Sequence, residues 1–282
     1  MNCKLLLAIA ASAMSAVFAQ QVVAQPECTV GTTGYMTIQN AVDDAECRTI
    51  IVPAGTFLEN LGINRSVTIR GAGPKLTTVD GSGEEDSVIV IGGTYVSPCG
   101  SPNVFVTLEG MTITGGKGPP AEEAHRNGGG IGAGPFVDVV VNDCVVTGNS
   151  AYGNGGGISV AQGRLTVIDS VISRNRAFGL GLTGEYIGGG GVRVAGCPSE
   201  LIVVNSVIEQ NVSDYRGGGI LSMASTLDRG RLIVKDSDIR RNEALATNGG
   251  GGVFFDGVLV TWSDSKVKHN EPNDVQDGPP AP

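Results

Sequence analysis

The sequence is poor in aromatic residues, in charge and in histidine. Aromatic residues are 5% and charged residues 17% of the 282 residues, and there are two histidines. No Cys-x-x-Cys motif or His/Cys cluster has the spacing of a zinc site. Beyond the first 24 residues no hydrophobic run approaches the length that spans a membrane. The net charge of −9 gives no reason to expect nucleic acid as a partner.

Glycine, in contrast, is abundant, with 44 residues against an average usage of about 7%. Much of it belongs to a repeated unit: a glycine triplet, an aliphatic residue, an alternating apolar run, Asp/Asn-Ser/Cys and a lone Asn. Unit lengths of roughly 26 to 36 residues indicate a solenoid, and the lack of a strict Gly-X-Y period excludes collagen. The triplets begin at Gly128, Gly155, Gly189, Gly217 and Gly250, and the closing residues are Asn149, Asn175, Asn211, Asn242 and Asn270.

The apolar residues inside each unit alternate with period 2. Leu165, Val167, Ser170 and Ile172 share one face if Asp169 marks a bend, so each unit contains two short strands that meet at a corner. The strand after the glycine triplet supplies a third side. We therefore predict an all-β single domain over residues 25–270, a parallel β-helix of about seven or eight coils.

The repeated asparagines and glycines each have a physical reason in such a stack. A buried Asn is costly alone, but an Asn one coil away can satisfy its amide, so one Asn per coil predicts an inward corner ladder. Gly116 stands where the Asn would be in an earlier unit. Glycine triplets allow positive φ and close backbone approach where the chain enters the next strand.

The N-terminal third of the sequence predicts further coils of the same β-helix, preceded by an element of a different kind. Residues 37–45 have helical spacing and would form a short helix that caps the open end of the stack. Cys28 and Cys47 flank this helix, and a bridge between them would fasten it. Strand-like runs follow at 49–52, 67–70, 77–79, 88–91 and 104–108.

The remaining cysteines cannot all form disulfide bonds within the mature chain. Cys3 lies in the leader, so an odd number remains in the mature chain. Cys144 takes the place that Ser170 has in the next unit, which indicates a small buried filler. Cys99 and Cys197 lie in loops about three coils apart, too far to join without unusual loop reach.

The two ends of the sequence suggest export and a mobile tail. Residues 1–24 read as a signal peptide, with Lys4, an apolar run and a small-residue exit. We expect a secreted or cell-surface protein, or a periplasmic one in a bacterium. Residues 271–282 are polar and rich in proline, which predicts a flexible tail.

Several segments resemble a known family. Residues 38–42, 51–57, 67–73 and 108–113 look like the opening coils of pectin lyase-like right-handed β-helices. The later Gly-Gly-Gly-Ile and Ile-x-x-Asn units resemble the repeats of polymorphic outer membrane proteins. The resemblance implies a right-handed coil and leaves function open, because this fold hosts lyases, hydrolases, esterases, adhesins and inert surface proteins.

One column of acidic residues invites a chemical interpretation. Neighbours in it would stand about 5 Å apart, close to the carboxylate spacing of retaining glycosidases, and they could bind Ca²⁺. The alternative is that each shapes a corner as an Asx turn. Asn205 favours the corner interpretation, because asparagine at this position keeps a hydrogen-bond acceptor but carries no charge. The column is Asp143, Asp169, Asn205, Asp236 and Asp264.

The resemblance further implies that catalytic groups would lie on outward positions of one strand face. The glycine-triplet strands offer no carboxylate pair there, and the catalytic residues stay unknown. His125, beside Glu122 and Glu123, could act as an acid–base group or belong to a solvated insertion. The outward residues of the triplet strands are Gly132, Ser159, Arg193, Leu221 and Phe254.

A second candidate surface lies in the loops between each ladder Asn and the next glycine triplet. Aromatic and arginine side chains gather there and should emerge along one edge of the tube. They suit stacking on sugar rings and pairing with uronate or sulfate groups; alternatively, the rings only cover their own loops. The candidate ligand-binding residues are Tyr152, Arg176, Phe178, Tyr186, Tyr215 and Arg216.

The sequence therefore favours an exported, non-catalytic binding or adhesion protein with a polysaccharide or cell-surface glycan as ligand. One alternative is a polysaccharide-active enzyme, such as a lyase acting on a polyuronate. Another is a purely structural repeat protein. No cofactor is expected, with Ca²⁺ the weaker possibility, and no membrane-spanning segment is expected after removal of the signal peptide.

Overall fold

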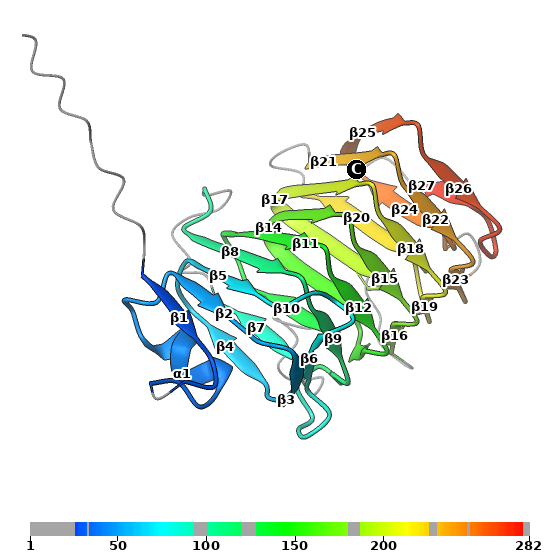
Figure 1. The fold of residues 1–282 in the computed structure, drawn as a ribbon. Coiled ribbons are helices and arrows are strands. Elements are labelled where there is room, and N and C mark those ends of the chain that lie inside the picture. The colour runs from blue at the N-terminus through cyan, green and yellow to red at the C-terminus, as the bar shows by residue number, and fades with distance from the viewer. Residues whose placement is uncertain are drawn as a thin grey trace, which may run out of the picture.

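The computed structural model describes residues 26–32, 34–92, 101–119, 128–179, 187–225, 230–246 and 249–278. The predicted signal peptide and Cys99, His125 and Tyr186 lie outside these ranges. The described strands pair in parallel and stack coil upon coil along one axis, as Figure 1 shows. The chain is thus a right-handed parallel β-helix, as predicted.

Each full coil contributes one strand to each of three faces. The first face contains the glycine-triplet strands, and the second face follows it around a bend that β14 and β17 cross without a break. The first face is built from β4 (Leu61–Ile63), β7 (Ile89–Ile91), β10 (Ile131–Ala133), the beginning of β14 (Ile158–Ile168), the beginning of β17 (Val192–Val204), β20 (Ile220–Ala224), β24 (Val253–Asp256) and β27 (Val275–Asp277). The second face is built from β1 (Glu27–Thr29), β2 (Thr49–Ile51), β5 (Val67–Arg70), β8 (Val104–Glu109), β11 (Val137–Asn142), the ends of β14 and β17, β21 (Gly230–Lys235) and β25 (Val258–Ser263).

The third face is a separate eight-stranded sheet, which confirms the expected seven or eight coils. Its members are β3 (Gly55–Leu58), β6 (Thr77–Asp80), β9 (Thr112–Thr114), β12 (Val145–Thr147), β15 (Val171–Ser173), β18 (Val207–Glu209), β22 (Asp238–Arg240) and β26 (Lys266–Lys268). A short edge sheet follows the ladder asparagines in four coils. It contains β13 (Ser150–Tyr152), β16 (Arg176–Phe178), β19 (Val212–Ser213) and β23 (Glu243–Ala244).

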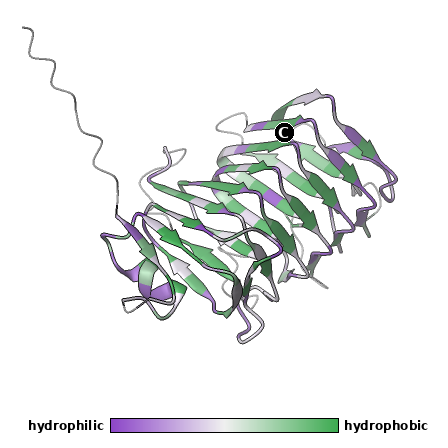
Figure 2. Ribbon diagram, in the orientation of Figure 1, coloured by the Kyte–Doolittle hydropathy of each residue, from purple (hydrophilic) through white to green (hydrophobic). Residues whose placement is uncertain are grey.

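The interior follows the alternation seen in the sequence. Leu165, Val167 and Ile172 are fully buried, and so are their counterparts one coil on. Hydrophobic residues recur on strand after strand along the stack in Figure 2. Because each coil buries its apolar side only against its neighbours, the core is one continuous column.

The predicted asparagine ladder runs through this interior. The side-chain amide of Asn175 donates to Oδ1 of Asn211 at 3.0 Å, and Asn211 donates to Asn242 in the same way at 3.0 Å. The same Oδ1 of Asn211 accepts the backbone N–H of Asn175 at 3.0 Å. The ladder begins where the N–H of Gly116 donates to Asn149, and it ends at the carboxylate of Asp274. Every amide in the ladder is therefore completed by the coil next to it.

A second polar ladder lies at the corner between the second and third faces. The N–H of Ser170 donates to Oγ of Ser206 at 3.1 Å, and that of Ser206 donates to Oγ of Ser237 at 3.1 Å. Cys144 opens this ladder, since its N–H donates to Oγ of Ser170. Its thiol is 1% exposed, which confirms the buried filler.

The glycine triplets are required by the asparagine ladder. A Cβ added to Gly157 would lie 2.9 Å from Nδ2 of Asn175 and 2.6 Å from the carbonyl oxygen of Gly191. Both distances are shorter than real Cβ contacts. The third glycine is therefore needed because the backbone runs directly over the amide column.

A helix closes the N-terminal end of the tube, as predicted. Helix α1 (Ile38–Asp43) buries Ile38, Ala41 and Val42, and Thr37 caps its N-terminus. The carboxylate of Glu59 accepts the backbone N–H groups of Ile38 and Gln39 at 3.0 Å each. The helix thus covers the apolar end of the first coils and has its own free N–H groups satisfied.

The opposite terminus of α1 is also fixed. Arg65 donates to the carbonyl oxygens of Ala41, Val42 and Asp44. The Cys28–Cys47 disulfide forms as the sequence suggested, with a Cα–Cα distance of 5.6 Å. The cap is therefore held from both sides.

The structure differs from expectation at Cys197 and after Asn270. Cys197 is disulfide-bonded. The sequence placed it about three coils from Cys99, which argued against a bond between these two residues. It lies on a bulge of β17 that departs from the regular coil path. The expected tail from Glu271 is partly structured, because Val275–Asp277 form β27, which pairs with β24. Within the described residues, no helix has the length and hydrophobicity to cross a membrane.

Replacing a central ladder residue should destabilise the fold strongly. Asn211→Ala removes the acceptor of two donors on Asn175 and the donor to Asn242, so several buried groups lose partners. We expect a loss of about 2–4 kcal/mol in the free energy of unfolding, measured by chemical denaturation. The matched change Asn64→Ala, at an exposed position between β4 and β5, should alter it by less than about 0.5 kcal/mol. Equal effects would contradict a stabilising ladder.

The buried thiol should be inert in the folded protein. Burial raises the pKa of the Cys144 thiol to about 12, because the thiolate loses its hydration. At pH 8 the thiol therefore stays protonated, and it is covered as well. We expect no alkylation of Cys144 by iodoacetamide in hours under native conditions and complete alkylation in denaturant, read by peptide mass spectrometry. Rapid native labelling would contradict the burial.

Candidate functional site

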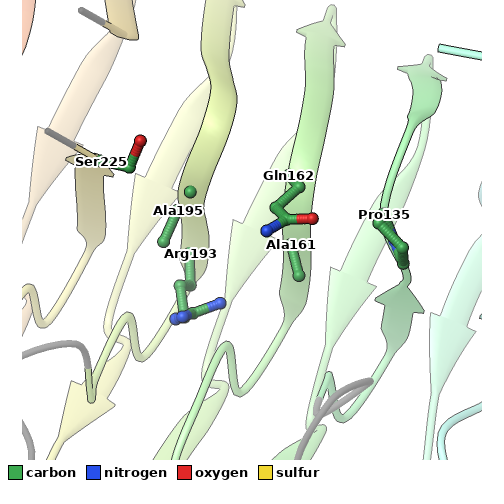
Figure 3. Close-up of a pocket in the computed structure, with 7 residues that line it drawn as sticks. Pro135, Ala161, Gln162, Arg193, Ala195 and Ser225 are labelled. Carbon is green, nitrogen blue, oxygen red and sulfur yellow. The ribbon is translucent and has the colours of Figure 1, made fainter. Parts of the chain in front are cut away.

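A pocket of about 520 Å³ opens on the outer side of the bend between the first and second faces. Its walls come from neighbouring coils. Figure 3 shows Gln162 on β14, Arg193 on β17 and Ser225 just after β20, with Pro135 one coil earlier. Successive coils are about 4.8 Å apart, so the pocket extends about 14 Å along the tube. The lining residues are Pro135, Ala161, Gln162, Arg193, Ala195, Gly196 and Ser225.

A bulge in β17 shapes this pocket. Ala161 pairs with Ala195, but the next pair is Gly163 with Ser199, so Gln162 alone faces residues 196–198. A Cβ on Gly196 would lie 2.7 Å from Cγ of Gln162, so this backbone packs directly on the glutamine. The longer segment of this coil therefore forms part of the pocket wall, through Gly196.

The backbone at Gln162 is itself unusual. Its φ is +57°, a left-handed conformation that costs an L-residue other than Gly, Asn or Asp about 1–2 kcal/mol. The equivalent corner residue in the preceding coil, Phe136, has φ +58°, and Gly257 occupies the corner near the C-terminus with φ +68°. The corner thus explains the conformation, and the choice of glutamine keeps an amide in the pocket.

Arg193 is the charged group of the described lining. It is half-buried, and burial lowers the pKa of its guanidinium to about 10, so it stays protonated at neutral pH. None of the described lining residues is Asp or Glu. A guanidinium beside an amide and small apolar side chains suits a ligand with a carboxylate or sulfate group.

A small hydrophobic cluster continues from the pocket along the first face. Arg193, Leu221 and Phe254 are in register on β17, β20 and β24. Leu221 and Phe254 take the outward positions predicted for them, but they are 0% and 2% exposed and pack with Ala195 and Met223. Outward position on a coil therefore does not mean exposure on this face.

Three of the predicted ligand-binding residues lie on strands of the edge sheet. Tyr152 and Phe178 are paired in register on β13 and β16, with ring centroids 5.7 Å apart in an edge-on arrangement. Arg176 forms an ion pair with Asp214 at 2.8 Å. The structure therefore brings these three predicted residues together.

The other two described candidates connect the edge sheet to its surroundings. The hydroxyl of Tyr215 donates to the carbonyl oxygen of Gly179. The guanidinium of Arg216 lies 4.7 Å from the ring centroid of Phe254, a cation–π contact. Each described candidate thus has a contact within the chain, which supports the alternative that these rings cover their loops. Tyr186 lies outside the described residues.

Sequence reasoning included Arg193 among the outward residues but missed Gln162 and the pocket itself. The available signal was the length of the chain between Ala195 and Ser199, which is longer than the corresponding single residue between Ala161 and Gly163. Without a known register that excess cannot be distinguished from a loop. The pocket therefore required the three-dimensional pairing.

The residues of the acidic column lie at the corners of successive coils. Its five members have φ between +46° and +49°, the left-handed conformation that Asp and Asn tolerate best. The amide of Asn205 donates to the carboxylate of Asp169 one coil away. Among the described residues no group of three or more His, Cys, Asp or Glu side chains is arranged to hold a metal ion. The corner placement is confirmed.

Comparison with known proteins gives little beyond the fold. No protein-family model matches the chain, and no curated protein matches it. A solved structure, a pectin methylesterase mutant in complex with a hexasaccharide, aligns over 90% of this chain and 92% of its own, with 10% identity and a TM-score of 0.37. The fold therefore rests on the strand pairing described above.

Substitution at a corner should separate a turn from a chemical site. Asp236→Gly should leave the free energy of unfolding within about 0.5 kcal/mol of the parent, because glycine adopts φ +49° freely. Asp236→Val should lower it by about 1–2 kcal/mol, because a β-branched residue is strained there. Thermal and urea unfolding with and without Ca²⁺ measures both. A Ca²⁺-dependent stabilisation lost in Asp236→Gly would instead indicate a metal site.

Proposed function

We propose that this protein is an exported β-helix that binds an acidic glycan along its outer surface without transforming it. The observation that carries the proposal is the pocket around Arg193, which is cationic and elongated along the tube axis. A chain of sugars lying along the axis would place an acidic group at Arg193 and rest on residues of neighbouring coils.

The surroundings of the pocket support an extended ligand. Arg216, whose guanidinium lies over the buried ring of Phe254, adds a second cationic group beside the outward row that contains Arg193. The edge sheet adds Tyr152 and Phe178, both half-exposed, and the exposed Arg176. Aromatic rings and guanidinium groups are the side chains that stack on sugar faces and pair with acidic substituents.

A second function, an enzyme that cleaves a polyuronate by elimination, draws support from Arg193 alone. Burial lowers the pKa of this guanidinium to about 10, in the direction required of a base that removes a proton next to a carboxylate. The described lining offers no second ionisable group to work with it. Binding without turnover is therefore the function that we favour.

Removing the guanidinium should weaken glycan binding. We expect Arg193→Ala to reduce affinity for polygalacturonate or alginate by about 10- to 100-fold, the loss of one or two charge-assisted hydrogen bonds. Isothermal titration calorimetry at two salt concentrations measures it, and the parent should bind more weakly at high salt. Arg70→Ala, which removes a remote surface ion pair with Glu109, is the matched control and should keep parental affinity.

The same samples distinguish the two functions. Incubation with polygalacturonate or alginate, with and without Ca²⁺, should give no unsaturated product, as followed by ultraviolet absorbance. Product formation that disappears in Arg193→Ala would establish the lyase. Absence of binding to acidic glycans by the parent would reject the favoured function.

A further inference from the structure

The outer side of the second face carries straight columns of side chains. Six of its strands, β8, β11, β14, β17, β21 and β25, follow one another along the stack (Figure 1) and keep one register there. Side chains alternate between the two sides of a strand, so every second register position forms an outward column. The first of three such columns contains Phe105, Asp138, Arg164, Glu200, Arg231 and Leu259.

The centre of this face is apolar although it lies outside the tube. The middle column holds only Val, Ile and Thr, with Ile202 near its centre, and the third column places Ile168 and Val204 beside it. These three side chains are half-buried, whereas Phe105 and Leu259, at the ends of the first column, are 54% and 55% exposed. An apolar patch with charged groups along its border is typical of a surface that another protein covers.

The charges of the first column alternate in sign. Asp138, Arg164, Glu200 and Arg231 are in register on four successive coils. Glu200 accepts from Arg164 at 3.1 Å and from Arg231 at 3.0 Å. Asp138 forms no ion pair with another described residue, and the side chain of Arg231 is 58% exposed. Read in the opposite direction, the column has the opposite charge at every position, so it is complementary to a reversed copy of itself.

We propose that a second copy of this chain packs on this face, related by a two-fold axis that runs parallel to the strands and passes between Arg164 and Glu200. The two tubes then lie side by side and run in opposite directions. The axis places Asp138 opposite Arg231 of the second copy, and Arg164 opposite Glu200 of the second copy, and each pair occurs twice. Every charge of the two columns thereby meets an opposite charge.

The same axis matches the apolar positions of the face. Phe105 lies opposite Leu259 of the second copy, so the two exposed side chains at the ends of the first column cover each other. In the third column Ile168 lies opposite Val204 of the second copy, and in the middle column Ile202 lies opposite a β-branched residue. One symmetry operation therefore satisfies both the charges and the apolar side chains.

A two-fold axis parallel to the tube matches the face poorly. It would place the first column opposite the third, with Glu200 facing Val204 of the second copy and Arg231 facing Lys235 of the second copy. That arrangement covers a charge with an apolar side chain and brings two cations together, and both contacts are unfavourable. The charges therefore favour the axis parallel to the strands.

The size of the face indicates a weak dimer. Six strands of about six residues measure about 29 Å along the tube and about 20 Å across. Packing two such faces removes roughly 1,200 Å² of surface from water, near the lower limit for a specific complex. We therefore expect a dissociation constant on the order of 1–100 µM, and no growth beyond a dimer, because a two-fold interface is closed.

Sedimentation equilibrium of the mature chain up to about 1 mM tests the proposal. We expect a monomer–dimer equilibrium that Ile202→Lys shifts at least about 100-fold toward monomer, because it places an ammonium group in the apolar centre. Val171→Lys, at an outward and half-buried position of the third face, is the matched control and should leave the dissociation constant unchanged. Both variants should keep the parental melting temperature. A chain that stays monomeric, assembles beyond a dimer or responds equally to the two variants overturns the proposal.

Exchange of the two outer charges tests the axis itself. Asp138→Arg sets an arginine opposite Arg231 of the second copy and should weaken the dimer about 10-fold or more. Adding Arg231→Asp restores an opposite pair and should recover the parental dissociation constant within a few-fold. With the axis parallel to the tube, position 138 would face Asn142, so Asp138→Arg alone would have little effect. A dimer that tolerates Asp138→Arg, or that Arg231→Asp does not restore, would reject this arrangement of the two copies.

Discussion

Hydrogen bonding from coil to coil is the constraint on which the rest of this structure depends. An Asn side chain in the interior is tolerable only because the next Asn accepts its amide and the preceding backbone N–H donates to its carbonyl. Such a column needs a different solution at each end. It begins with the N–H of Gly116 and ends at Asp274, whose carboxylate accepts but cannot donate, so the ladder stops there.

The amide column then dictates the neighbouring sequence. The third glycine of each triplet is needed because a Cβ there would collide with the Asn amide, as Gly157 shows against Asn175. The corner after the second face repeats Asp or Asn because its backbone is left-handed, and the serine ladder beside it repeats for the same reason as the asparagines. One buried interaction thereby accounts for most of what recurs in the sequence.

What recurs in phase could be predicted, and what departs from the repeat could not. The ladder, the corner column, the buried Cys144, the cap helix and the Cys28–Cys47 bridge all follow from spacing and residue type. The bulge opposite Gln162 did not, because extra residues in one coil look like a loop until their register is known. Burial of Leu221 and Phe254 was missed because outward position was equated with exposure. β27 was hidden by the polar, proline-containing composition around it.

The contrast between residues that repeat and residues that do not indicates where a ligand could be recognised. The interior of a repeat is fixed by its neighbours, so a ligand can be distinguished only by residues that differ from coil to coil on the outer surface. Gln162, Arg193 and Ser225 are far apart in sequence but adjacent in space, because each belongs to the next coil along the axis. The glycan that we propose as ligand would run along the tube and contact one residue from each coil. Its binding site would then be a column across the repeats, which no contiguous motif in the sequence could reveal.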